Sequence, residues 1–428
     1  MRPRPSLPLC AMCLLAWLAV PGGIARAQNP PEHTATAGQA SREASAAFDQ
    51  VWRIARDRFY DPTMHGLDWN AVGQRYRAQA VEAGDRDARA AIVNRMLDEL
   101  GASHTRLFTP DEPAYYQLAD IFERPLQRQG FSRIWPSGQV TYPAIGIFTE
   151  TDGEGRIFVT GVIAGAPAAR GGLLVGDEIV SADGQMFQPV GSFRGKVGGP
   201  VQLTIRRTRE GPTLTVGVVP EELNPGAMFL KGLEEGARII TANGRRIGYV
   251  HIWSYASWRY QSALENLLGS GKLKDADAVV WDLRDGWGGA QPDYLDLFDG
   301  RAPILELTGR DGKPGLANFR WRKPVAMLVN QDTRSGKEVL ARGFETYNMG
   351  PVIGTRTEGA VLAATAFLIS DDTLLLLAID DVLVDGQRLE GIGVHPTVPV
   401  AFDRRYAAGA DPQLDRAVQI LSGGDQAR

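Results

Sequence analysis

The hydrophobic positions after residue 45 first recur at helical spacing. Apolar residues three or four positions apart line one face of an α-helix. Two such groups precede Gly101: Phe48, Val51, Trp52, Ile54 and Phe59, then Ile92, Met96, Leu97 and Leu100. This spacing predicts a small helical domain over residues 46–125.

The pattern then changes to short β-branched runs separated by Gly, Pro and Asp. The clearest runs are Ile157–Thr160, Glu178–Ser181 and Val201–Arg206. Such runs, bounded by turn residues, are typical of strands. Residues 142–222 are therefore expected to form a compact β-rich domain.

From residue 223 onward, apolar runs alternate with helical patterns. Residues 246–252, 277–284 and 326–329 have the composition of buried strands. Helices are expected between them, which predicts an α/β domain over residues 223–428. The fold class expected for the whole chain is therefore multidomain α/β.

The first 45 residues differ in composition from the rest. An apolar run at residues 7–20 is followed by Ala25, an arginine and Ala27. This is the pattern of a cleaved signal peptide, here residues 1–27. Residues 28–45 are rich in Pro, Ala, Thr and Gln and are expected to be a flexible leader. We therefore expect a periplasmic or secreted protein.

Composition limits the expected partners. The chain has 428 residues and a formal net charge of −4, which becomes −7 without the three arginines of the signal peptide. No run of Lys or Arg favours nucleic acid, and no later segment is long and apolar enough for a transmembrane helix. The two cysteines, Cys10 and Cys13, lie in the segment expected to be removed, and the five histidines lack metal-ligand spacing. No metal or other cofactor is expected.

One serine lies at a position suited to nucleophilic attack. Ser335 follows the apolar run 326–329 and a short polar loop, and it precedes a helical pattern. A helix N-terminus offers backbone N–H groups and positive dipole to an oxyanion. A serine in this position can instead serve only as the helix N-cap. Position alone leaves both roles open.

Two further segments carry candidate chemistry. Gly288 and Gly289 follow the strand that ends near Arg284, where glycines allow close approach of a ligand or simply form a tight turn. His104 follows a helical segment and is either a general base or a surface histidine favoured by the helix dipole. His251 lies within an apolar strand, which is typical of a core residue.

The β-rich region resembles bacterial PDZ domains. The likeness rests on residues 166–180, which contain a Gly-Leu-Leu-Val-Gly-Asp sequence, on the Asp-Gly pair at 183–184, and on residues 193–203. The resemblance implies a loop that binds a peptide C-terminus while the peptide adds to the sheet as a strand. That loop comprises Ala144, Ile145, Gly146 and Ile147. The alternative is a PDZ fold used only as a rigid spacer.

Together, the three regions resemble the tail-specific, or C-terminal-processing, serine peptidases, whose catalytic domain has a ClpP/crotonase-like fold. Asn330, Ser335 and Glu338 have the offsets of the family's nucleophile motif. Residues 282–289 resemble its Asp-Leu-Arg loop with paired glycines. Residues 391–397 resemble its closing Gly-x-Gly-Val-x-Pro-Asp segment, although threonine replaces the usual aspartate.

The best-known branch of this family pairs its serine with a downstream lysine that acts as the base. Here Ala360 occupies the lysine position and Ala364 the position of a glutamine. Alanine cannot accept a proton. The resemblance therefore implies either an inactive protein or the tricorn-like branch, whose base is a histidine from the helical domain.

The tricorn-like branch places a Ser-His pair after a helical segment and a glutamate in a late segment, and both are present here. The resemblance implies Ser335 as nucleophile and His104 as general base, with Ser103 and Glu390 completing the network. An imidazole with a pKa of about 6.5 could take the serine proton. The amides of Gly336 and Gly288 would face the oxyanion.

Two other side chains compete for the role of base. His395 lies close in sequence to Glu390, and Lys337 lies two residues after Ser335. Helix geometry would direct Lys337 away from Ser335.

The expected function is that of an exported serine endopeptidase that cleaves peptide bonds of proteins or peptides and docks substrate C-termini on its PDZ domain. A PDZ scaffold without catalytic activity and an esterase that uses Ser335 are the alternatives. The sequence leaves the substrate and the oligomeric state open.

Overall fold

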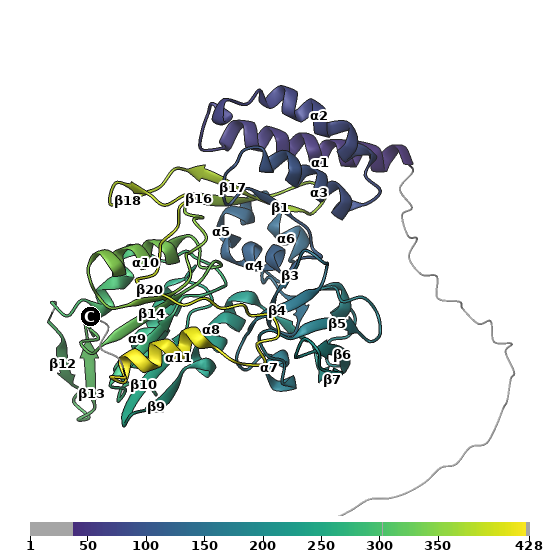
Figure 1. The fold of residues 1–428 in the computed structure, drawn as a ribbon. Helices are drawn as coiled ribbons and strands as arrows, with labels where there is room; N and C mark the ends of the chain where they lie inside the picture. Colours follow the sequence, from purple (N-terminus) through teal and green to yellow (C-terminus); the bar gives the residue numbers. More distant parts are fainter. Residues whose placement is uncertain (1–36, 302, 425–428) are drawn as a thin grey trace, which may run out of the picture.

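The computed structural model describes residues 37–301 and 303–424 (Figure 1). The expected signal peptide, and the leader as far as residue 36, lie outside this range. The described part is a multidomain α/β structure, as the sequence predicts. Three helices lie at the top of Figure 1, a β-rich unit lies at the lower right and an α/β unit at the lower left.

The N-terminal region consists of α1 (Ala37–Arg58), α2 (Trp69–Glu82) and α3 (Arg86–Asp98). Because α1 begins at Ala37, residues 37–45 are helical, and the prediction of a flexible leader was wrong for them. Ala44, Ala47 and Phe48 are buried on the inner face of α1, whereas residues 38–43 are exposed and extend the helix N-terminally from that packed part. A single amphipathic face of this kind outweighs a polar composition.

These helices do not enclose a core by themselves. They pack on a three-stranded sheet in the order β1 (Arg106–Phe108), β17 (Leu374–Asp380) and β16 (Ala363–Leu368). One hydrophobic cluster joins Phe48 and Met96 of the helices to Leu362, Leu375 and Leu377 near or within the β16–β17 hairpin. The C-terminal part of the chain therefore supplies one wall of the helical region (Figure 1).

Short helices connect this region to the β-rich unit. They are α4 (Pro113–Ile121), α5 (Glu123–Leu126) and α6 (Phe131–Ile134). Their buried side chains, including Tyr115 and Phe131, pack with Leu374 and Leu376 of β17 in a second cluster. The β16–β17 hairpin thus contributes to two cores.

The β-rich unit is a five-stranded antiparallel sheet. Its order is β3 (Ile147–Thr151), β4 (Ile157–Val162), β5 (Glu178–Ala182), β6 (Val201–Arg206) and β7 (Thr213–Val218). The short helix α7 (Pro167–Gly171) follows β4, and β2 (Tyr142–Ala144) pairs with β8 (Glu221–Leu223) at the base of the unit. Because β3 is an edge strand, its outer side is available to another strand.

The α/β unit is built on a six-stranded sheet. Its order is β20 (Val398–Pro399), β15 (Val352–Gly354), β14 (Val325–Val329), β11 (Ala278–Asp282), β10 (Arg245–His251) and β9 (Arg238–Ala242). All neighbours are parallel except β9 and β10. The helices around it are α8 (Pro225–Gly236), α9 (Trp258–Gly269), α10 (Gly336–Thr346) and α11 (Pro412–Leu421). The predicted strands in this unit are confirmed.

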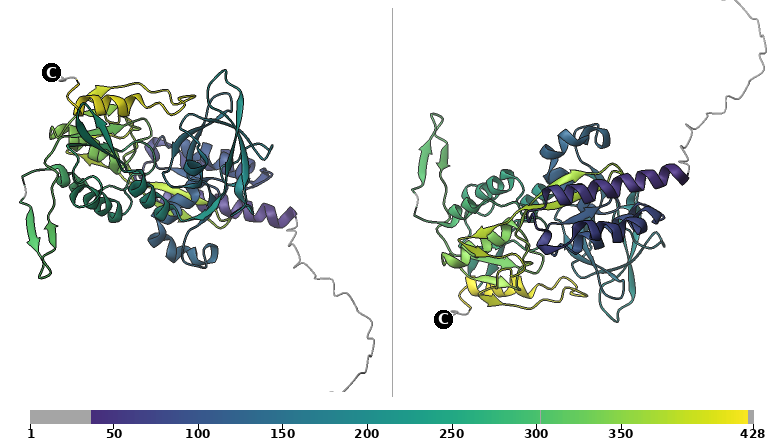
Figure 2. Two further views of the ribbon diagram at one scale, coloured as in Figure 1. Left: turned by 90° about the horizontal axis from the view of Figure 1, so that it is seen from below. Right: turned by 90° about the horizontal axis from the view of Figure 1, so that it is seen from above.

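Two hairpins extend from the α/β unit. One is β12 (Leu305–Thr308) with β13 (Pro314–Ala317), which projects away from the rest of the chain (Figure 2). The other is β18 (Leu383–Val384) with β19 (Gln387–Arg388). Short 3-10 helices complete the described elements: η1 (Met64–Gly66), η2 (Gln127–Gln129), η3 (Gly191–Phe193) and η4 (Pro292–Phe298).

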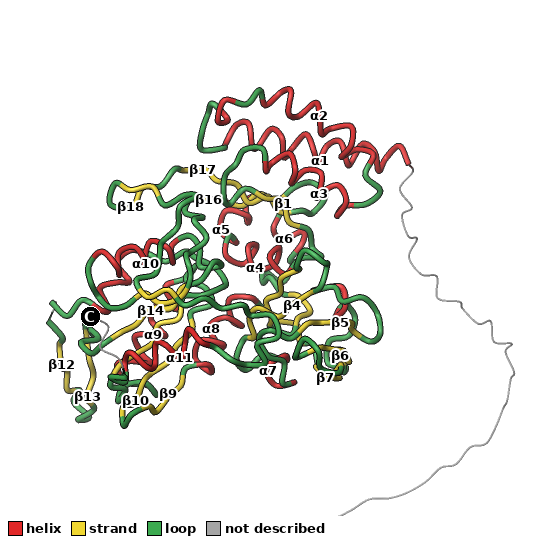
Figure 3. The backbone as a smooth tube through the Cα atoms, viewed as in Figure 1, coloured by secondary structure: helices red, strands yellow, loops and turns green. Residues whose placement is uncertain are grey.

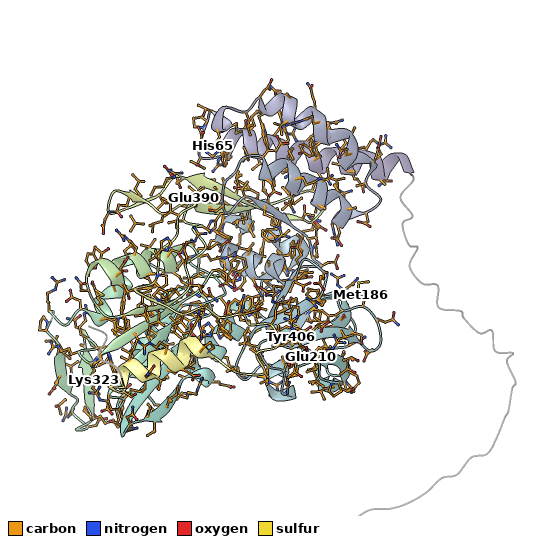
Figure 4. All side chains as sticks on the ribbon, viewed as in Figure 1. His65, Met186, Glu210, Lys323, Glu390 and Tyr406 are labelled. Atoms are coloured by element: carbon orange, nitrogen blue, oxygen red, sulfur yellow. The ribbon has the colours of Figure 1, made fainter. Side chains whose placement is uncertain are left out.

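Residues 402–411 form a strap that ties the α/β unit to the β-rich unit. The Tyr406 amide donates to Gly176 O (2.9 Å), and its hydroxyl donates to Glu178 Oε2 (2.8 Å). Arg404 pairs with Glu150 of β3 and with Asp285 and Asp332 of the α/β unit. Figure 4 shows Tyr406 beside the β-rich unit, far from the N-terminal helices α1, α2 and α3.

Candidate active site

Four irregular segments converge on the α/β sheet: residues 101–105, 283–291, 355–362 and 389–397. All four are loops in Figure 3 apart from an isolated bridge at Trp287. Loops positioned by a rigid sheet are where binding and catalytic groups concentrate. Each of these segments carries a residue that the sequence analysis singled out.

Ser335 occupies the N-cap position of α10 with a strained backbone. Its φ of 57° and ψ of −132° lie in a region that L-residues rarely adopt. Such a conformation costs on the order of 1–3 kcal/mol and persists only where the surroundings enforce it. The Ser335 amide donates to Ala360 O (2.8 Å) and to Glu338 Oε2 (3.2 Å). Both bonds hold the turn that presents the side chain.

Gly288 and Gly336 lie directly against Ser335. A Cβ added to Gly288 would stand 2.5 Å from Ser335 Cβ and 2.9 Å from Gly336 N. A Cβ added to Gly336 would stand 2.4 Å from the amide of Ala290. Within residues 37–301 and 303–424, neither glycine amide donates a hydrogen bond. Both amides are therefore free to receive an acceptor beside the serine.

His104, Ser103 and Glu390 form a hydrogen-bonded relay. Ser103 Oγ donates to Glu390 Oε2 (2.9 Å), and His104 Nδ1 lies 3.0 Å from the same Oγ. Because the single hydroxyl proton goes to the carboxylate, Nδ1 carries the proton of the neutral ring. The remaining nitrogen, Nε2, then has its lone pair free to act as a base.

One loop connects this relay to the serine. Ala360 O accepts from the Ser335 amide, while the next residue, Val361, donates its amide to Glu390 Oε2 (2.8 Å). The relay and the serine are thus held by adjacent residues of the 355–362 loop. In the described part of the chain, Ser335 Oγ and His104 are not hydrogen-bonded. In enzymes without substrate such contacts are often long and tighten on binding.

Glu338 organises this loop, a role that the sequence analysis did not assign. Its buried carboxylate accepts from Thr357 Oγ1 (2.5 Å), from the Gly359 amide (2.7 Å) and from the Ala360 amide (2.8 Å). Burial raises the pKa of Glu338, and the surrounding donors oppose that shift. The sequence does carry a signal for this role, because a glutamate three residues after an N-cap serine is the pattern of a capping box.

Burial controls the charge of His104. The ring is half-buried. Burial, assisted by the cation of Arg334, lowers the pKa of His104 to about 4, and Glu390 opposes this shift. Arg334 itself pairs with Glu358 (2.7 Å) and lies over the Trp287 ring, 5.4 Å from its centroid. The imidazole is therefore neutral near pH 7.

The competing bases lie elsewhere. Lys337 is fully buried, and its Nζ donates to Asp285 O (2.7 Å) rather than to Ser335. His395 is exposed. His251 stacks on Trp253 (3.7 Å between centroids) and bonds Arg284 O through Nε2 (2.8 Å), so its assignment to the core is confirmed.

The predicted PDZ loop faces this site. A cavity of about 500 Å³ is lined by Ala144, Ile145, Gly146 and Ile147 on one side. Its other side includes Asp285, Gly286, Trp287, Asp332, Arg334 and Arg404. Phe148 of β3 stacks on Trp253, 5.5 Å between centroids, so the edge strand is packed against the α/β unit. A ligand added to β3 would therefore lie in the cavity beside the serine loop.

Neither a metal cluster nor a membrane span is found in the described chain. No group of three or more His, Cys, Asp or Glu side chains in residues 37–301 and 303–424 is arranged to hold a metal ion. Over the same residues, no helix combines the length and the apolarity needed to cross a bilayer.

Family models match three regions of the chain. Residues 246–400 match Peptidase family S41, residues 40–98 match the Tricorn protease C1 domain, and residues 158–207 match a PDZ domain. Residues 246–400 therefore form a peptidase family S41 domain. The protein is a serine peptidase, and therefore a hydrolase.

Two relatives illustrate the range of this family. The peptidase is 25% identical over 371 residues to carboxyl-terminal-processing peptidase 3 of Arabidopsis thaliana chloroplasts, covering 82% of this chain and 67% of the relative. It is 26% identical over 394 residues to tricorn protease homolog 1 of Streptomyces coelicolor, covering 87% of this chain. It spans only 34% of that longer relative.

Solved structures share the fold. The photosystem II D1 C-terminal processing protease has a TM-score of 0.50 at 19% identity, covering 89% of this chain and 97% of that protein. The tricorn protease has a TM-score of 0.52 at 19% identity, covering 90% of this chain and 37% of that protein. The predicted likeness to C-terminal-processing and tricorn peptidases is confirmed at the level of fold.

The pKa of His104 gives a test of its role as base. A lowered histidine pKa means that the neutral base persists to lower pH, so kcat/KM should rise with pH through about 4 rather than about 6.5. The unfolded chain binds this proton near the ordinary value, so folding stability should fall as pH drops from about 6.5 towards 4. Rate profiles measured over the pH range in which the peptidase stays folded check this. The role of His104 would be contradicted if kcat/KM fell off on the acid side around pH 6.5 and the same fall persisted in His104→Gln.

Proposed function

We propose that this peptidase is an exported serine endopeptidase in which Ser335 is the nucleophile and His104 is the general base. The observation that carries the proposal is the relay from Glu390 through Ser103 to His104, tied by Val361 and Ala360 to the Ser335 amide. Acyl transfer requires a nucleophile and a neutral base, and here a serine in a strained turn and an imidazole with a free Nε2 are held by the same loop.

The chemistry follows from these positions. Ser335 Oγ attacks the carbonyl carbon of the scissile bond while its proton passes to His104 Nε2. The tetrahedral oxyanion accepts hydrogen bonds from the amides of Gly336 and Gly288. When the C–N bond breaks, the proton on Nε2 passes to the leaving amine. Water then attacks the acyl-enzyme and gives its proton to Nε2. The bond between Ser335 Oγ and the acyl carbon breaks, Nε2 returns the proton to Oγ, and the product leaves as its carboxylate once the new acid group ionises.

Glu390 and Ser103 act through His104. When the ring is protonated, the Glu390 carboxylate stabilises the positive charge across the Ser103 hydroxyl. The carboxylate is also fixed by the amides of Val361 and Ser103, at 2.8 and 2.9 Å. A carboxylate fixed in this way orients the Ser103 hydroxyl and so keeps the proton of His104 on Nδ1, which supports histidine over lysine as the base in this chain.

Lysine is poorly placed for the same task. Ala360 fills the position of the family's lysine and is buried against the serine turn. Lys337 is engaged with Asp285 O on the far side of that turn. The Ser-His arrangement therefore explains the contacts better than a Ser-Lys pair.

The PDZ domain is proposed to dock the free C-terminus of the substrate. The amides around Gly146 would receive the carboxylate, and the peptide would pair with the open edge of β3. The loop around Gly146 and the residues before Ser335, Asp332 and Arg334, line one cavity. Docking and cleavage would therefore take place on the same segment of substrate.

Export to the periplasm or the medium is proposed from the leader sequence. The apolar run at residues 7–20 and the Ala-Arg-Ala sequence before Gln28 support cleavage at that point. Intact mass of the exported protein checks this, since the mature chain should begin at Gln28. A mature chain that retains residues 1–27 would contradict it.

Replacing the nucleophile tests the reaction itself. Ser335→Ala should abolish peptide hydrolysis and labelling by a serine-directed phosphonate, because the neighbouring hydroxyl of Thr333 is buried and bonded to Leu283 O (3.2 Å). The fold should persist, since an N-cap contributes only about 1 kcal/mol. Peptide hydrolysis, ester hydrolysis and labelling of the purified protein are the measurements. A wild type that resists labelling would favour the inactive scaffold, and one that cleaves esters alone would favour the esterase.

The docking role is tested with paired substrates. Peptides with a free C-terminus should be cleaved with a higher kcat/KM than the same peptides carrying a C-terminal amide. Gly146→Ala should remove this preference, because its Cβ would stand 2.3 Å from Ala166 Cβ and close the loop. Gly315→Ala, where the nearest neighbour is 3.8 Å away, is the control. Equal rates on both peptides in the wild type would favour the spacer role.

A further inference from the structure

Lys337 is a fully buried cation that the proposed reaction does not use. It is the second residue of α10, and its Nζ donates to the backbone carbonyl of Asp285 (2.7 Å). Isolated lysine charges are costly to bury, and a methionine of similar length would fill the same space without that cost. A lysine at this position therefore requires an explanation beyond packing.

The carbonyl that Lys337 binds belongs to a strained turn. Asp285 has a φ of 57°, and its other polar groups are already fixed. Its carboxylate accepts from Asn330 Nδ2 (3.0 Å) and from Arg404 (2.6 Å), and its amide donates to Asn330 Oδ1 (3.3 Å). Among the described residues, only Lys337 donates a hydrogen bond to the Asp285 carbonyl. Without that donor the carbonyl would be buried and unsatisfied, and the turn could relax.

This turn continues directly into the proposed oxyanion site. A Cβ on Gly286 would stand 2.0 Å from Trp253 O, and the Trp287 amide donates to the same carbonyl (2.8 Å). Gly288 follows, with its backbone against Ser335. Its amide shares a peptide plane with the Trp287 carbonyl, which accepts from the Tyr255 amide (3.3 Å), and the Gly288 carbonyl accepts from the same amide (3.0 Å). The direction of the Gly288 amide is therefore determined by the turn that starts at Asp285.

We propose that Lys337 is a positioning residue that holds the 285–288 turn so that the Gly288 amide faces the oxyanion formed at Ser335. This inference rests on the proposed function, because it needs Ser335 as the nucleophile. Lys337 acts through the Asp285 carbonyl and does not touch substrate.

The charges around Lys337 are compatible with a role as hydrogen-bond donor. Asp282 of β11 and Asp285 attract its charge, Arg334 repels it, and His251 of β10 shares the pocket. Burial, opposed by these carboxylates, lowers the pKa of Lys337 to about 7. Both the ammonium and the neutral amine can donate to a carbonyl, so the contact is available on either side of that pH.

The test is Lys337→Met, which keeps the volume and removes the donor. The wild type is first shown to cleave peptide and to be titrated by the phosphonate, since failure at this step would refute the proposed function itself. In Lys337→Met, kcat per titrated site should fall on the order of 10²-fold, as when an oxyanion donor is lost, while KM stays near the wild-type value. An interaction made only in the transition state produces this split, whereas partial unfolding would lower the number of titrated sites.

Two further variants complete the experiment. Lys323→Met is the matched control, because Lys323 Nζ also donates to a backbone carbonyl, that of Ala276 (2.6 Å), and Figure 4 shows it far from Glu390. Its kcat should not change. Lys337→Gln has a shorter side chain that still ends in an N–H donor group. Its kcat should lie between those of Lys337→Met and the wild type. Wild-type kcat per titrated site in either Lys337 variant would overturn the proposal, as would a rise in KM alone. If Lys337→Met does not fold, the glutamine variant decides by the same criteria.

Discussion

The buried carboxylate of Glu338 is the contact on which the rest of the candidate site depends. It projects from the first turn of α10 and binds the amides of Gly359 and Ala360, the hydroxyl of Thr357 and the amide of Ser335. A carboxylate with that many donors fixes both the strained serine turn and the loop opposite it. Because Val361 of that loop binds Glu390, the orientation of the histidine relay also follows from this contact.

The fold brings distant parts of the chain together through one hairpin. The β16–β17 hairpin shares one core with the N-terminal helices and another with α4 and α6. His104 lies on the short segment between α3 and β1, and β1 pairs with β17. The packing of the helices on the hairpin therefore sets the distance between the histidine and the serine.

The β-rich unit and the α/β unit are joined by charge as well as by packing. Arg404 binds carboxylates from both units, those of Glu150, Asp285 and Asp332. One of these, Asp285, starts the turn that carries Gly288. The edge of the PDZ-like sheet and the serine loop consequently share a buried cation, which keeps the cavity between them in one shape.

The sequence by itself determined the elements and the chemical inventory, because both depend on local spacing. The apolar periods identified helices, strands and the α/β sheet, and motif offsets identified Ser335, Glu338 and the Ala360 substitution. Tertiary structure decided what depends on long-range packing. Ser103 and Glu390 bond across 287 positions, and no local pattern could give that contact or the burial that lowers the pKa of His104. The burial of Lys337 and its bond to the Asp285 carbonyl were decided in the same way, by residues that are remote in sequence.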